Sequence, residues 1–137
     1  PLARVTFMTT ISTLSVFTWV NFVSYVMNLR SLYRSPRIGL SVNYLRHPEL
    51  LSLSALNQSG REYFRSALEI SSSLPNLLNH EKAQMTQIAE LITGTPNESD
   101  GNLGRGLTVY LAELQKRRGL RPWREVFPQL EAFLLKK

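Results

Sequence analysis

Polar side chains that suit ligand binding follow an apolar segment at residues 38–42. Asn43, Arg46 and His47 stand at the start of "NYLRHPELLSLSAL" (residues 43–56), together with a proline and a glutamate. A guanidinium suits a carboxylate or a phosphate, while amides and hydroxyls suit a ribose or an amino-acid group. A second group, of hydroxyl side chains, stands near the end of another apolar segment: Thr9, Thr10, Ser12 and Ser15.

Two strands joined by a helix would position both groups. The β-branched segment 4–11 and the segment 37–43 are typical of strands, and apolar residues at helical spacing over 16–29 predict a helix between them. A strand–helix–strand order favours parallel pairing through a right-handed crossover. Ligands of parallel α/β folds bind at the carboxyl ends of the strands, so the two groups would form the rim of one site. Alternatively, the hydroxyls cap the next helix and His47 is a loop residue.

The rest of the chain predicts helices near 57–73, 80–92 and 103–119, then short helical turns interrupted at Pro128. Residues 49–56 fit neither a strand nor a helix cleanly and suggest a short extended piece leading to a turn, and residues 93–102 suggest a loop rich in Gly, Pro, Asn and Asp. The expected fold class is α/β and helix-rich: a partial parallel sheet of two strands with a crossover helix (residues 1–74), followed by a helical C-terminal region (75–137). Two strands do not form a stable open sheet alone. We therefore expect further strands, supplied by this chain, by a missing N-terminal half or by a partner chain.

The uncharged run over residues 5–29 has a second interpretation, because 25 apolar and polar residues without a charge are long enough to cross a bilayer. Its many Thr, Ser and Asn residues favour a strand and a helix over a membrane span. A separate hypothesis about function is that the chain is a subunit whose uncharged run is buried in a larger assembly or a membrane.

Composition limits the function classes. The chain has 137 residues, 43% of them hydrophobic, which suits one domain with a core. It has no cysteine, which excludes disulfides and thiolate chemistry and fits a cytoplasmic location. His47 and His80 lack metal-ligand spacing, so we expect no metal. No catalytic constellation is recognisable, and whether the chain is an enzyme stays open.

A basic segment, "KRRGLRPWRE" (residues 116–125), contributes to the net charge of +6 and suggests an anionic partner. Cations with an interleaved aromatic suit phosphate contact and base stacking, so nucleic acid or an acidic protein is a candidate partner. The candidate residues are Lys116, Arg117, Arg118, Arg121, Trp123 and Arg124. The alternative is a solvated helix end, with Trp123 packed in the core beside Phe127.

Three segments resemble the C-terminal half of twitch-type radical S-adenosylmethionine proteins: "MTTISTLSVF", "VNYLRHPELLSLSAL" and "LAELQKRRGLRPWREVFPQLEAF". In that family a Thr/Ser-rich strand end, a segment of the form "hP-yLSv--LP" and a final "--evFPEl" occur in this order. Asn57 stands where the family has proline, Gln129 where it has glutamate, and Gln115 about where it often has aspartate.

The resemblance implies a partial barrel that contributes contacts to a substrate or to S-adenosylmethionine. The family's CxxxCxxC motif is absent, so an iron–sulfur cluster would belong to a missing half, and this chain itself would hold no cofactor. The rim at residues 9–15 and 43–47 is where the resemblance places the ligand contacts.

Overall fold

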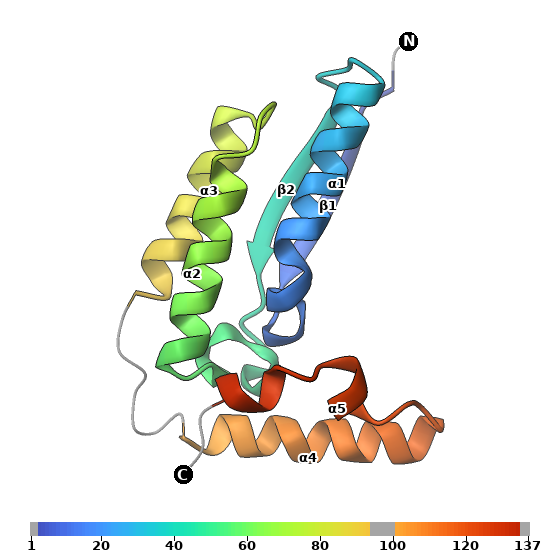
Figure 1. The fold of residues 1–137 in the computed structure, drawn as a ribbon, viewed down its shortest axis with the longest axis vertical. Coiled ribbons are helices and arrows are strands. Elements are labelled where there is room, and N and C mark those ends of the chain that lie inside the picture. Colours follow the sequence, from blue (N-terminus) through green and yellow to red (C-terminus); the bar gives the residue numbers. More distant parts are fainter. Residues whose placement is uncertain (1–2, 94–100, 135–137) are drawn as a thin grey trace.

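The computed structural model describes residues 3–93 and 101–134, and it has the expected helix-rich α/β fold (Figure 1). Strands β1 (Val5–Ile11) and β2 (Ile38–Tyr44) form a parallel pair. A 3₁₀ helix, η1 (Thr13–Thr18), and helix α1 (Trp19–Leu32) connect them. The prediction that residues 5–29 form a strand and a helix is thus confirmed. Within the described ranges, no helix combines the length and apolar character needed to span a membrane.

The later helices also lie close to their predicted positions. They are α2 (Gln58–Ser72), α3 (Asn79–Leu91), α4 (Gly101–Arg118) and α5 (Trp123–Val126), followed by the 3₁₀ turn η5 (Leu130–Phe133). Figure 1 shows α4 lying across the end of the molecule toward which β2 points. Of the expected loop at 93–102, residues 94–100 lie outside the described part, while Gly101 and Asn102 already belong to α4.

Residues 49–56 do not form the expected short extended piece leading into a turn. This segment forms two 3₁₀ turns, η2 (Glu49–Leu51) and η3 (Leu53–Ala55). The hydroxyl of Ser52 donates to the carbonyl of Glu49 (2.7 Å) and accepts from the amide of Ser54 (3.2 Å). Such local bonds to the backbone compete with extended structure and favour turns.

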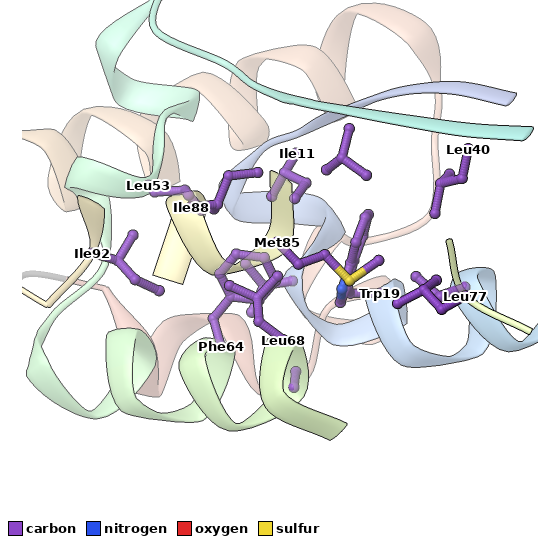
Figure 2. Close-up of a cluster of buried hydrophobic side chains, with 14 of the residues drawn as sticks. Ile11, Trp19, Leu40, Leu53, Phe64, Leu68, Leu77, Met85, Ile88 and Ile92 are labelled. Atoms are coloured by element: carbon purple, nitrogen blue, oxygen red, sulfur yellow. The ribbon is translucent and has the colours of Figure 1, made fainter. Parts of the chain in front are cut away.

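Helices pack on one face of the sheet and leave the other face bare. Alternate strand residues such as Ile11, Leu40 and Val42 are buried in a core built with α1, α2 and α3. Figure 2 shows Trp19, Phe64 and Met85 meeting in this core. The remaining strand positions face the other way, and most of them are exposed; their side chains are Thr6, Met8, Thr10, Gly39, Ser41 and Asn43. Met8 is 79% exposed, so around Met8 no described residue covers this face.

A second apolar cluster joins the C-terminal part to the turns that follow β2. Ala55 of η3 is buried together with residues of α4, α5 and the C-terminal turns. These are Leu107, Leu111, Trp123, Leu130 and Leu134. The cluster fixes α4 below the carboxyl ends of the strands.

A buried ion pair between Arg30 of α1 and Glu81 of α3 crosses the main core. The guanidinium donates two hydrogen bonds to the carboxylate, at 2.6 and 3.0 Å, and the side chains are 6% and 0% exposed. Arg30 also donates to the carbonyls of Ile38 (2.8 Å) and Asn76, while Glu81 accepts from the amides of Leu40 and Leu78, both at 2.8 Å. Every charge is thus met by several partners, which is what a buried pair needs.

Helix α3 closes one edge of the sheet through side chains. The amides of Leu40 and Val42 point away from β1, and they donate to Glu81 (2.8 Å) and to the side-chain oxygen of Gln84 (3.1 Å). On β1, the Val5 amide donates to Arg37 and the Ile11 carbonyl accepts from Leu45, so alternate residues bond to β2. The amides of the intervening β1 residues therefore point to the opposite edge, which no described strand occupies.

Asn57 joins the start of α2 to the C-terminal turn. Its side-chain oxygen accepts from the Gly60 amide (2.9 Å), and its side-chain nitrogen donates to the Ala132 carbonyl (2.8 Å). The Asn57 amide donates to the Phe133 carbonyl, also at 2.8 Å. A Cβ at Gly60 would lie 2.8 Å from that carbonyl oxygen, so this approach requires glycine.

The first prediction concerns the ion pair. Glu81→Gln leaves Arg30 buried without a counter-charge, so we expect the free energy of unfolding in urea to fall by about 3–5 kcal/mol. The matched control is Glu69→Gln, which breaks the exposed 3.8 Å pair with Arg65. That variant should lose less than about 1 kcal/mol. Equal losses in the two variants would contradict the account.

The ion pair of Arg30 and Glu81 also predicts how the free energy of unfolding changes at acidic pH. Burial raises the pKa of Glu81, but the hydrogen bonds from Arg30, Leu78 and Leu40 and the charge of Arg30 outweigh it and hold the pKa below its ordinary value. The unfolded chain therefore takes up this proton first. The stabilisation is complete above the ordinary glutamate pKa of about 4.3 and is lost as the pH falls through the folded-state pKa. Between about pH 4.3 and the folded-state pKa, the stability of the wild type should decline more steeply than that of Glu81→Gln, and parallel curves would refute this role.

A pair of glycine substitutions tests the contact at the start of α2. Gly60→Ala should lower the free energy of unfolding by about 1–3 kcal/mol, because the new methyl group overlaps the carbonyl oxygen and the Cβ of Phe133. Gly106→Ala in α4 meets nothing within 4 Å and should stabilise the protein by about 0.5–1 kcal/mol. Thermal unfolding of both variants measures the contrast, and a tolerated alanine at Gly60 would show that the contact with Phe133 is loose.

Candidate functional site

A cavity of about 390 Å³ lies beyond the carboxyl end of β2. The end of β2, the turns η2 and η3, and helices α2, α3 and α4 all contribute to its wall. The lining residues are Tyr44, Leu45, Arg46, His47, Glu49, Ser52, Leu53, Ser54, Arg61, Ile88, Leu91, Ile92 and Leu103. The cavity is therefore at the position where parallel α/β folds bind ligands.

Charged groups of both signs line the cavity. Arg46 and Glu49 are exposed to solvent, and the guanidinium of Arg46 lies 5.1 Å from the centre of the Tyr44 ring. Arg61 is buried, and its Nε donates to the Leu56 carbonyl (3.1 Å). A cation suits a carboxylate or a phosphate, and a carboxylate suits an ammonium group. The lining therefore offers groups for an anion and one carboxylate for a cation.

An apolar wall completes the cavity. Leu53, Ile88 and Ile92 belong to the main core, and Figure 2 shows them at one end of that cluster. Leu103 of α4 adds to this wall from the C-terminal cluster. The cavity thus combines this apolar wall with a polar one, and its volume lies within the range of about 300–1,000 Å³ that is usual for small-molecule sites.

Of the residues that the sequence predicted to form one rim, some line the cavity and others lie elsewhere. Arg46 and His47 line the cavity. Thr10 and Asn43 are neighbours in the strand register, as expected, but they lie on the bare face of the sheet. Because side chains alternate along a strand, they point away from the cavity.

Of the remaining hydroxyls near β1, that of Ser15 bonds to the backbone. The Ser15 hydroxyl accepts from the Ser12 amide (2.8 Å) and donates to the Ser12 carbonyl (2.9 Å), which caps η1. Thr9 is half-buried in β1 and does not line the cavity. Thr13, which sequence reasoning did not select, is buried and donates to the Ser52 carbonyl, so it joins the start of η1 to the turns that follow β2.

Sequence reasoning also missed the far wall of the cavity. Glu49 and Ser52 lie in the quoted segment 43–56, but Arg61, Ile88 and Leu103 come from three different helices. The spacing of apolar residues in the sequence predicts the helices that contain these residues. It does not predict that the three helices meet at one cavity. The described residues hold no group of three or more His, Asp or Glu side chains placed to bind a metal.

The basic segment is exposed except for its tryptophan. Trp123 is 5% exposed in the C-terminal cluster, where Phe127 packs against it, and the Arg124 guanidinium lies 4.5 Å from its ring centre. Trp123 is therefore a core anchor and offers no free face for base stacking. The cations are all exposed: Lys116, Arg117, Arg118, Arg121 and Arg124.

Comparisons of this chain with protein-family models, with curated proteins and with solved structures found no significant match.

Proposed function

We propose that this chain forms one wall of a small-molecule site in a larger parallel α/β protein, and that the ligand carries an amino-acid group. The observation that carries the proposal is the cavity at the carboxyl end of β2, with Arg46 and Glu49 in its lining. Arg46 would bind the α-carboxylate and Glu49 the α-ammonium group. The leucine and isoleucine side chains would contact the apolar part of the ligand.

The bare face and the open β1 edge support the larger assembly. Parallel sheets are normally covered on both faces, and two strands are too few for an independent sheet. Along β1, the backbone groups of Thr6, Met8 and Thr10 pair with no strand in the part of the chain that the structure describes. We propose that a further parallel strand, from another part of a longer chain or from a partner, pairs with this edge.

The resemblance to twitch-type radical S-adenosylmethionine proteins fits this proposal. S-adenosylmethionine carries the amino-acid group that the lining suits, and the chain would contribute contacts to it or to a substrate. Since the chain has no cysteine, any iron–sulfur cluster would be bound by other residues, and we derive no chemical step for this chain. The role proposed is binding and positioning.

Titration with S-adenosylmethionine, followed by backbone amide shifts, tests the proposal. We expect weak binding with shifts at residues 44–47 and 52–54, because one wall offers few contacts to offset the entropy of association. Methionine should shift the same amides, while adenosine alone should shift them less. The absence of shifts at millimolar ligand would contradict the proposal.

Two substitutions test separately how each charged side chain contributes to binding. Arg46→Ala should weaken methionine binding about tenfold, the loss expected for a charge-assisted hydrogen bond. Glu49→Gln should weaken methionine more than its deaminated analogue, which lacks the ammonium group. Arg105→Ala, an exposed arginine of α4 outside the lining, is the control and should bind like the wild type.

A further inference from the structure

We propose that a second surface, the groove between α4 and α5, binds an acidic peptide segment through large apolar side chains. The groove has a volume of about 350 Å³ and is separate from the β2 cavity. Six apolar side chains line it: Leu111, Leu114, Leu120, Trp123, Val126 and Phe127. Leu120 and Val126 are both 52% exposed, so the margins of the groove are apolar and open to solvent.

The lining lacks the polar groups that would orient a metabolite. Its two polar side chains are Gln115 and Arg121. The Gln115 side-chain oxygen already accepts a hydrogen bond from the Trp123 amide (3.2 Å), and Arg121 is exposed. Small-molecule sites hold their ligands by a few placed polar groups. This groove instead suits leucine-like or aromatic side chains supplied by another polypeptide.

The charge around the groove defines the partner. Lys116, Arg117 and Arg118 form the last turn of α4, and Arg121 and Arg124 follow it. Arg117 pairs with Glu113 (3.6 Å) and Arg124 with Glu131 (3.1 Å), both on the exposed surface. The cations complement the negative end of the α4 dipole and still leave an excess of positive charge. Such a field favours an acidic partner.

A peptide fits this surface better than a nucleic acid does. Base stacking needs an exposed aromatic face, whereas Trp123 is buried and its ring is covered by Arg124. The apolar side chains of the groove also make no favourable contact with the charged phosphates of a nucleic acid. An acidic amphipathic helix places apolar side chains at i, i+3, i+4 and i+7 on one face and carboxylates on the other, which matches an apolar groove with a basic rim.

The test uses a synthetic amphipathic peptide with leucines at those positions and glutamates at the others, titrated into the full chain and followed by amide shifts. We expect shifts at residues 111–127 and an affinity that falls as salt is raised. A scrambled peptide of the same composition should bind at least tenfold more weakly. Equal binding of both peptides would overturn the proposal, as would tighter binding of a mixed single-stranded oligonucleotide to the same residues.

Surface variants locate the contact without disturbing the core. Leu120→Glu and Val126→Glu should each weaken peptide binding at least tenfold, and Arg121→Glu should weaken it severalfold and reduce its salt dependence. Val109→Glu is the matched control, because Val109 is 58% exposed on α4 and does not line the groove. Unchanged binding in Leu120→Glu and Val126→Glu would show that the groove is not the binding surface.

Discussion

The buried pair of Arg30 and Glu81 is the interaction on which the arrangement of this protein depends. It joins α1 to α3, and Glu81 also accepts the Leu40 amide of β2, so one carboxylate fixes two helices against the sheet. Burying two charges is costly, and it is tolerated because the backbone of β2 and of the loop before α3 supplies further hydrogen bonds. The position of α3, and with it the wall of the β2 cavity formed by Ile88 and Ile92, follows from this network.

The same network makes the two edges of the sheet different. Side chains of α3 accept hydrogen bonds from outward-pointing amides of β2. The backbone groups of Thr6, Met8 and Thr10 on β1, by contrast, pair with no described strand. Within the described residues, β1 thus offers the open edge for extension of the sheet. The uncharged sequence of β1 fits a strand that is to be paired, since exposed edge strands are usually protected by charges or prolines.

Much of the fold follows from local sequence patterns, and much of the site does not. The β-branched run at 5–11 and the helical spacing after Trp19 predict β1 and α1, and Pro75 marks the end of α2. The bonds of Ser52 were missed, because a serine in an apolar run gives no sign of its backbone partners. Arg30 and Glu81 lie 51 residues apart and each looks like an ordinary surface charge in sequence. The cavity likewise depends on α2, α3 and α4 meeting, and that contact is set by tertiary packing.

Amide hydrogen exchange along the two strands tests the central claim most directly. The account predicts slow exchange for Leu40 and Val42, whose amides donate to Glu81 and Gln84. It predicts fast exchange for Thr6, Met8 and Thr10, whose amides face the open edge. In Glu81→Gln, the exchange rate of the Leu40 amide should rise much more than the rates of the amides that join β1 to β2. Fast exchange at Leu40 in the wild-type protein, or protection along the free edge of β1 in the isolated chain, would contradict the account.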